Sequence, residues 1–247
     1  MTQRKTIAVI PARYASSRFP GKVLANLCGK PMIQHVWEKA AASKADQVLV
    51  ATDDEKVIQA VKKFGGNAVM TAADHPSGTD RIYEAITGTE AEIIINVQGD
   101  EPLLPVAVID QLIDKMQSDP SLEMGTVAVP RPRAELENDP NKVKVVFGSN
   151  GMAHYFSRSM IPFLREGGNE TTSYLHWGVY AYRRDILKRY ISLPEGRLEQ
   201  CEKLEQLRAL ENGIGIFVLT SDLESIGVDT PEDLERATEK LQQLQSS

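Results

Sequence analysis

The chain has 247 residues, of which 42% are hydrophobic and 25% charged, and its formal net charge is −6. This composition suits one large domain, or one domain with a subdomain, and the negative charge argues against general affinity for nucleic acid or acidic membranes. No stretch approaches the ~18 apolar residues of a membrane-spanning helix, and the first residues lack the apolar core of a signal peptide. With only two cysteines, neither in a metal-type spacing, we expect a cytoplasmic protein without structural zinc.

The first half of the chain alternates predicted strands and helices. Apolar, β-rich runs predict strands at residues 6–10, 47–51, 68–70 and 92–97. Apolar periodicity predicts helices at residues 30–42, 79–86 and from Pro105 onward. Another helix follows Thr52, whose spacing to Glu55 is that of a capping box with Thr52 as N-cap. Such alternation implies right-handed crossovers, and we predict an α/β fold with a doubly wound, mostly parallel sheet.

From about Met124 the pattern becomes richer in strands. Strands are predicted at residues 124–129, 143–147, 152–157, 178–182 and 214–219, with a hairpin turn at Asn150-Gly151. A helix is predicted at residues 199–211, and a terminal helix begins with Thr230 as N-cap. The buried stripe of that last helix should hold Leu234, Ala237, Leu241 and Leu244. We expect one domain over residues 1–247, with an inserted subdomain at about 130–194.

The loop that follows the first predicted strand is small, hydroxylated and basic. It runs from Pro11 to Lys22 and carries the cations Arg13, Arg18 and Lys22. Small residues let backbone N–H groups approach an anion, and three cations neutralise it, so a triphosphate is the natural ligand. The alternative is an ordinary exposed basic loop. Its place at the carboxyl end of the first strand favours the ligand site, because open α/β sheets bind ligands there.

Two aspartates are candidates for a divalent cation. Asp100 follows a buried strand and a glycine, and Asp229 precedes a helix that Thr230 already caps. Mg²⁺ binds through one or two carboxylates and completes its shell with water and phosphate oxygens. Each residue also has a simpler reading: Asp100 as a turn residue, and Asp229 as an acid that complements the helix dipole.

Further candidates carry weaker signals. Ser77 and Gly78 begin a helix and suit recognition of a base edge or an anion, but they also fit a plain N-cap. Glu205 projects into an apolar sector of the helix predicted at 199–211, where it could bind a polyhydroxylated ligand or pair with Arg208.

Two other segments end in residues that suit a pocket. His176 and Tyr180 lie on one face of a strand and could line a pocket, or simply form a strand end. Arg158 could bind a substrate carboxylate or form a surface ion pair.

Taken together, these residues closely resemble the CMP-Kdo synthetases, the 3-deoxy-manno-octulosonate cytidylyltransferases. The resemblance spans nearly the whole chain, and its motifs lie at residues 11–22, 29–32, 50–53, 74–81, 96–102, 143–146, 155–158, 204–208 and 227–234. The basic loop alone would indicate only a sugar nucleotidyltransferase. The later motifs, in this order, point to the narrower family. The chain departs from the pattern at Trp177 and Ile226.

The resemblance implies a Rossmann-like nucleotidyltransferase fold with a β-rich dimerisation subdomain, and a homodimer. It implies that CTP and 3-deoxy-manno-octulosonate (Kdo) give CMP-Kdo and pyrophosphate with Mg²⁺, for lipopolysaccharide synthesis. Carried onto this chain, the triphosphate would be held by Arg13, Ser17, Arg18 and Lys22. The cytosine would be read by the backbone of Pro11 and Ala12 with Ser77 and Gly78. Mg²⁺ would be held by Asp100 and Asp229, and the Kdo site lined by Gln98, Arg158, His176, Tyr180 and Glu205.

Two alternatives stay open from the sequence. The enzyme could activate a related 2-keto sugar acid, either the 8-amino analogue of Kdo or a sialic acid. A more distant alternative is a non-catalytic nucleotide-binding regulator on the same fold. The pair Asp100 and Asp229 argues against the regulator, because a protein that only binds a nucleotide needs neither.

Overall fold

The computed structural model describes residues 5–15, 19–168 and 171–245. The chain folds into two compact units. Unit 1 comprises residues 1–113 together with 224–247, and unit 2 comprises residues 114–223. The segment 130–194, expected as a subdomain, falls within unit 2. The C-terminal segment thus returns to unit 1 and completes it.

Unit 1 contains a parallel sheet whose strands follow the order β6, β1, β4, β5. The bounds are β1 (Thr6–Pro11), β4 (Gln47–Thr52), β5 (Ala68–Met70) and β6 (Ile93–Asn96). Side chains of β1 and β6 are almost completely buried, as expected for central parallel strands. These strands confirm the prediction from the sequence. Because all four run the same way, their carboxyl ends lie at one edge of the sheet.

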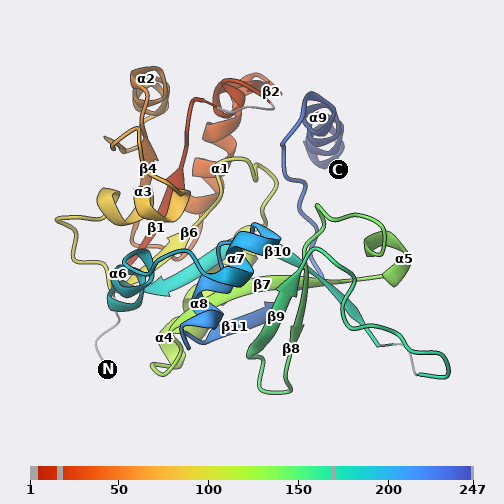
Figure 1. The fold of residues 1–247 in the computed structure, drawn as a ribbon. Coiled ribbons are helices and arrows are strands. Elements are labelled where there is room, and N and C mark those ends of the chain that lie inside the picture. Colours follow the sequence, from red (N-terminus) through yellow and green to blue (C-terminus); the bar gives the residue numbers. More distant parts are fainter. Residues whose placement is uncertain (1–4, 16–18, 169–170, 246–247) are drawn as a thin grey trace. The chain divides into compact units, whose positions relative to one another are not determined.

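Figure 1 shows the helices of unit 1, of which the first three along the chain pack against these strands. They are α1 (Met32–Ala41), α2 (Glu55–Lys63), α3 (Gly78–Ala85), α4 (Val106–Ser118), which leads into unit 2, and α9 (Pro231–Gln245). The 3₁₀ turn η1 (Lys22–Leu24) and the short pair β2 (Asn26–Leu27) and β3 (Lys30–Pro31) lie between β1 and α1.

Two helix starts in unit 1 differ from the prediction. The helix expected from Lys30 begins at Met32, because Lys30 and Pro31 pair with β2 instead. The N-cap of α2 is Asp54, whose side chain accepts a hydrogen bond from the Lys56 N–H at 2.7 Å, so Thr52 is not the cap. Thr52 belongs to β4, which extends one residue further than expected.

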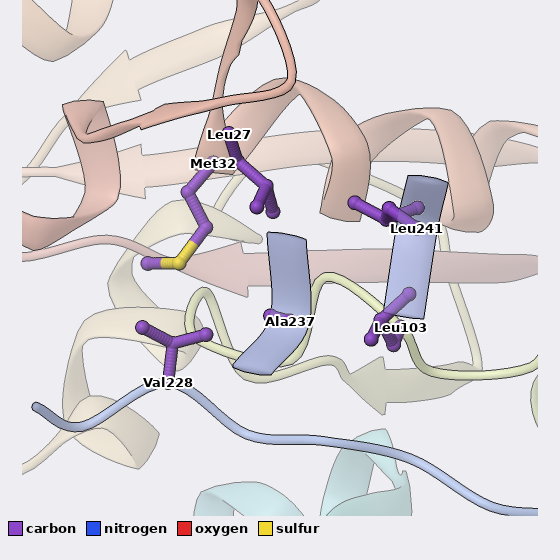
Figure 2. Close-up of a cluster of buried hydrophobic side chains, with 6 residues drawn as sticks. All are labelled: Leu27, Met32, Leu103, Val228, Ala237 and Leu241. Carbon is purple, nitrogen blue, oxygen red and sulfur yellow. The ribbon is translucent and has the colours of Figure 1, made fainter. Parts of the chain in front are cut away.

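A buried cluster fastens α9 to the rest of unit 1. Figure 2 shows its six side chains, Leu27, Met32, Leu103, Val228, Ala237 and Leu241. Ile226 and Leu234 pack against the cluster, which gives the unusual Ile226 an apolar neighbourhood. Leu244, expected in the buried stripe, is 59% exposed. The prediction for that residue was wrong because the core ends one turn earlier.

Unit 2 is rich in antiparallel strands. Its strands are β7 (Met124–Arg131), β8 (Lys144–Phe147), β9 (Ala153–Ser157), β10 (Ser173–Arg183) and β11 (Ile216–Thr220). Antiparallel pairs join β7 with β10, β10 with β8, and β8 with β9, whereas β11 is parallel to β7. Gly151, with φ of +77°, lies in the predicted hairpin turn between β8 and β9.

The helix predicted at residues 199–211 is two helices. They are α7 (Arg197–Glu202) and α8 (Leu207–Glu211), and they are separated by Lys203 in the left-handed conformation at φ +52°. Unit 2 also contains α5 (Arg133–Leu136) and α6 (Arg184–Ile191). Within the described ranges, no helix combines the length and apolar character needed to cross a membrane.

Candidate active site

Three charged side chains from distant parts of the sequence meet in unit 1. The Lys22 ammonium donates to Asp100 Oδ2 at 2.6 Å and to Asp229 Oδ1 at 2.9 Å. It also approaches the Val228 carbonyl oxygen at 3.3 Å. The loop after β1, the end of β6 and the start of α9 thus supply one group each. Both aspartate carboxylates therefore contact the same ammonium group.

The two carboxylates favour the charged form of Lys22. Burial by itself would lower the pKa of Lys22, but the Asp100 and Asp229 carboxylates outweigh it and raise that pKa. The Lys22 side chain is 13% exposed, whereas Asp100 and Asp229 are 31% and 46% exposed. The carboxylates therefore keep an accessible side, where solvent or a ligand can complete the coordination of a cation.

The local chain geometry explains why the two aspartates lie close together. A Cβ atom at Gly99 would lie 2.8 Å from the Pro11 carbonyl oxygen, so only glycine lets the residues after β6 pass this close to β1. The Val228 N–H donates to the Asp100 carbonyl oxygen at 2.8 Å. Asp229 and Thr230 both donate their N–H groups to Asp233 Oδ2, and the Thr230 hydroxyl accepts from the Asp233 N–H. The predicted cap of α9 is therefore present, and Thr230 serves as the N-cap.

Glu101, beside Asp100, was not singled out from the sequence. The Ser225 hydroxyl donates to Glu101 Oε2 at 2.6 Å, and Gly227 leaves room for the same carboxyl group. Burial raises the pKa of Glu101 to about 7, in spite of the hydrogen bond from Ser225. Asp100 and Glu101 are consecutive acidic residues. This pair was the one feature of the sequence that could have drawn attention to Glu101.

The loop after β1 is anchored at several points. Arg13 donates to the His75 carbonyl oxygen, and its Nε is buried without a hydrogen-bond partner among the described residues. Fully buried Arg81 donates to Asp53 Oδ2 at 2.9 Å, and Asp53 Oδ1 accepts from the Tyr14 N–H at 3.4 Å. The ion pair between Arg81 and Asp53 thus holds the backbone of the loop at Tyr14. Ser17 and Arg18, predicted to bind the triphosphate, lie outside the described residues.

The residues expected to read the base gather around the end of β1. The Ala12 N–H donates to the Ala51 carbonyl oxygen at 2.8 Å, and a Cβ atom at Gly78 would lie 3.7 Å from Pro11 Cβ. Ser77 is the N-cap of α3, with its hydroxyl accepting from the N–H groups of residues 79 and 80. The plain N-cap reading of Ser77 is therefore correct, and α3 begins beside Pro11. Their role in base recognition stays a prediction.

Three residues predicted to line the sugar site lie close together in unit 2. The rings of His176 and Tyr180 are 5.5 Å apart, and Tyr180 stacks on Tyr182. Burial raises the pKa of Tyr190, and the nearby Glu205 carboxylate raises it further. The same carboxylate also raises the pKa of Tyr180, though less than burial does. Glu205 therefore lies near this row of aromatic rings. Arg208 donates to both oxygens of Glu199. The hydrogen bond to Glu199 raises the pKa of Arg208 and the Glu205 carboxylate raises it further, so both roles predicted for Glu205 stay predictions.

The His176 imidazole is held neutral. Burial lowers the pKa of His176 to about 3. Its Nε2 lies 2.9 Å from Thr126 Oγ1, whose hydroxyl also has the Val179 carbonyl oxygen at 2.9 Å. Because a hydroxyl has one hydrogen, donation to Val179 leaves its oxygen to accept from an Nε2–H. This arrangement favours a tautomer with an unprotonated Nδ1.

Arg158 and Gln98 have partners of different kinds. The Arg158 guanidinium donates to the backbone carbonyls of Glu202, Pro140 and Lys203 at 2.6, 2.9 and 3.2 Å. Its own N–H donates to the Glu202 carboxylate at 2.9 Å. Arg158 therefore supports the turn after α7, and a role toward a substrate carboxylate stays a prediction. Gln98 belongs to unit 1, where its amide donates to Asn96 at 3.4 Å.

Comparisons with known proteins agree on one family. The family model described as "Cytidylyltransferase" matches residues 7–225. A 3-deoxy-manno-octulosonate cytidylyltransferase from Thermodesulfovibrio yellowstonii is 53% identical, covering 94% of this chain and 96% of its own. One from Trichlorobacter lovleyi is 48% identical, covering 96% and 98%.

Solved structures give the same result. The structure of a CMP:2-keto-3-deoxy-manno-octonic acid synthetase complexed with CTP matches with a TM-score of 0.93 and 46% identity, covering 97% of this chain and 99% of that one. A cytidylyltransferase from Leptospira borgpetersenii, with a TM-score of 0.66 and 17% identity, covers 97% of this chain and 87% of its own and shares the fold. The sequence, the site geometry and these likenesses lead to one conclusion: the chain belongs to the 3-deoxy-manno-octulosonate cytidylyltransferase family.

Proposed function

We propose that this chain transfers CMP from CTP to the anomeric hydroxyl of Kdo and releases pyrophosphate. The observation that carries the proposal is the meeting of Lys22, Asp100 and Asp229 at one point of unit 1. Family membership over nearly the full length supports the choice of substrates, as does the relative that was solved with CTP.

The residues present fit a magnesium ion. Two carboxylates converge on one cationic position, and Mg²⁺ prefers one or two carboxylates together with substrate phosphate oxygens. Among the residues described here, no group of three or more His, Cys, Asp or Glu side chains forms a metal cluster. This accords with a site that the substrate completes. When bound, Mg²⁺ would lower the pKa of a coordinated hydroxyl and offset charge on the phosphate.

The side chains of unit 1 have defined tasks in this reaction. Asp100 and Asp229 would hold Mg²⁺. The anomeric hydroxyl of the sugar would attack the α-phosphorus of CTP in line with the departing pyrophosphate. Lys22 would direct its ammonium to the phosphates and stabilise the charge that builds on the leaving group. Arg13 and Arg18 bind the same triphosphate. No covalent intermediate on the protein is needed.

The sugar is bound, we propose, by Gln98, Arg158, His176, Tyr180 and Glu205. The row of rings in unit 2 provides an apolar wall, and Glu205 provides an acceptor for sugar hydroxyls. Neutral His176 can accept a hydrogen bond at Nδ1. A carboxylate that accepts from hydroxyls gives specificity, because an analogue that lacks the hydroxyl leaves it unpaired.

The setting of the enzyme is also proposed. We place it in the cytoplasm, as a homodimer whose interface involves the segment 130–194, in lipopolysaccharide synthesis. Phe163 and Leu164 in this segment are adjacent apolar residues that are 84% and 37% exposed, and a partner surface that covers them would bury both. Free thiols at Cys28 and Cys201 accord with a reducing compartment.

One experiment tests the activity and its alternatives. Pyrophosphate release is measured with CTP and Mg²⁺ against Kdo, its 8-amino analogue and a sialic acid. We expect the highest kcat/KM with Kdo, and no release without sugar or after removal of Mg²⁺ by a chelator. A higher kcat/KM with the 8-amino analogue or the sialic acid would change the substrate. CTP binding without any release would favour the non-catalytic regulator.

A further inference from the structure

A hydrogen-bonded pair beside the aspartates has no part in the chemistry described above. Ser225 Oγ donates to Glu101 Oε2 at 2.6 Å, a short hydrogen bond between two segments of unit 1. We propose that Glu101 and Ser225 are positioning residues. Their bond holds residues 225–229 against residues 99–101 and so fixes the Asp229 carboxylate at its working distance from Asp100. The inference rests on the proposed metal role of the two aspartates.

Three contacts join the two segments, and they have different consequences. The Val228 N–H donates to the Asp100 carbonyl oxygen at 2.8 Å. Gly227 passes so close to Glu101 that an added Cβ would lie 3.0 Å from Oε1. The Glu101–Ser225 bond is a contact between side chains and involves neither aspartate. A substitution can therefore remove this bond while it leaves Asp100 and Asp229 chemically unchanged.

Asp229 is fixed on its other side by different interactions. Its N–H donates to Asp233 Oδ2 within the cap of α9, and Val228 packs in the buried cluster of Figure 2. These interactions secure the backbone after residue 228. Before it, Ile226 packs against the same cluster, and Ser225 supplies the side-chain hydrogen bond to Glu101. Loss of the serine hydroxyl should thus leave α9 and its packing in place and loosen the approach to Asp229.

The test is a comparison of Ser225→Ala with a matched serine elsewhere. Ser121 Oγ donates to Asp119 Oδ1, also at 2.6 Å, in an exposed turn of unit 2, and Ser121→Ala is the control. Mn²⁺ binding to each protein with CTP, in the absence of sugar, is followed by electron paramagnetic resonance. We expect Ser225→Ala to bind Mn²⁺ about 10-fold more weakly, as for other residues that support metal ligands. Ser121→Ala should bind Mn²⁺ as the unmodified protein does, and Ser225→Thr should restore binding.

The outcomes separate the two proposals. Unchanged Mn²⁺ binding by Ser225→Ala overturns the positioning role and leaves the proposed function intact. If the unmodified protein with CTP binds no Mn²⁺ and turns over without a divalent cation, the metal role fails and the positioning role fails with it.

A double variant distinguishes loss of the Glu101–Ser225 bond from a general loss of stability. If the bond acts as a unit, Glu101→Ala combined with Ser225→Ala should lose no more Mn²⁺ affinity than the worse single variant. Glu101→Gln, which still accepts from Ser225, should lose less than Glu101→Ala. Losses that add in the double variant, or a thermal midpoint that falls in proportion to the loss of Mn²⁺ affinity, would overturn the proposal.

Discussion

The two units of this chain stabilise their candidate functional residues in opposite ways. In unit 1, the Lys22 ammonium forms salt bridges with Asp100 and Asp229, and the two carboxylates outweigh burial and raise the pKa of Lys22. In unit 2, His176 and Tyr180 lie among aromatic rings, and burial keeps both side chains neutral. The first arrangement depends on charge and the second on exclusion of water.

The difference predicts how each region responds to substitution. Removing one charge from the unit 1 cluster leaves the others unbalanced, so the effect should fall on chemistry and cation binding. Replacing a residue in the unit 2 cluster changes packing and hydrogen bonding, so the effect should fall on sugar binding and on folding stability. The predictions below test this contrast, from the largest expected effect to the smallest.

Asp100→Asn should have the largest effect. It keeps the size of the side chain and removes the charge that faces Lys22, so turnover should fall by about 10²–10³-fold, the range seen when an electrostatic stabiliser of a transition state is lost. Pyrophosphate release with CTP and Kdo measures turnover, and the thermal midpoint reports folding. Asp119→Asn, which removes a carboxylate paired with Lys115 at 3.4 Å, is the control and should turn over normally. Turnover close to normal in Asp100→Asn would remove this residue from the metal role.

Lys22→Met should separate catalysis from cation binding. Turnover should fall by about 10²-fold, because the leaving group loses a stabilising charge. Without substrate, however, Mn²⁺ should bind the variant more tightly than the unmodified protein, since the ammonium no longer pairs with both aspartates. Mn²⁺ titration of the substrate-free protein measures this. Weaker Mn²⁺ binding in the variant would mean that Lys22 does not share the position of the cation.

The strands and candidate site residues of unit 1 were predicted from the sequence more completely than those of unit 2. The strands of the parallel sheet read as apolar runs, and their shared carboxyl edge placed Lys22 and Asp100 together. The cap of α9 could be predicted from Thr230, Pro231 and Asp233. Because Thr230 fills the N-cap position, Asp229 was available as a second ligand beside Asp100.

The misses have local physical causes. Lys203 in a left-handed conformation breaks the helix predicted at 199–211, and no glycine or proline marks that position. Arg208 in α8 then pairs with Glu199 in α7 across the break. Glu101 was missed since its partner, Ser225, lies far away in the sequence. Tertiary partners of this kind leave no periodic signal.

Arg158→Lys should affect stability first. The three guanidinium hydrogen bonds to backbone carbonyls cannot all be made by an ammonium, so the free energy of unfolding should fall by about 2 kcal/mol. Urea denaturation measures it. Arg189→Lys, which loses one such bond at a half-exposed site, is the control and should change stability by less than about 0.5 kcal/mol. A stable Arg158→Lys protein with a greatly raised KM for Kdo would instead mean that Arg158 acts mainly on the substrate carboxylate.

The smallest effect concerns the charge of His176. Its pKa is lowered to about 3 in the folded protein, whereas an unfolded histidine titrates near 6.5. The unfolded chain therefore binds the extra proton first, and the free energy of unfolding should fall as pH drops below about 6.5. Between pH 6.5 and 5.5 the loss from this one group is about 1 kcal/mol. Urea denaturation at both pH values should show that His176→Gln lacks this part of the pH dependence, whereas the variant His154→Gln, at an exposed position, retains it. A ring proton resonance of His176 that titrates near pH 6.5 would show that the imidazole is open to water, and the contrast between a charged unit 1 site and a neutral unit 2 site would then fail at His176.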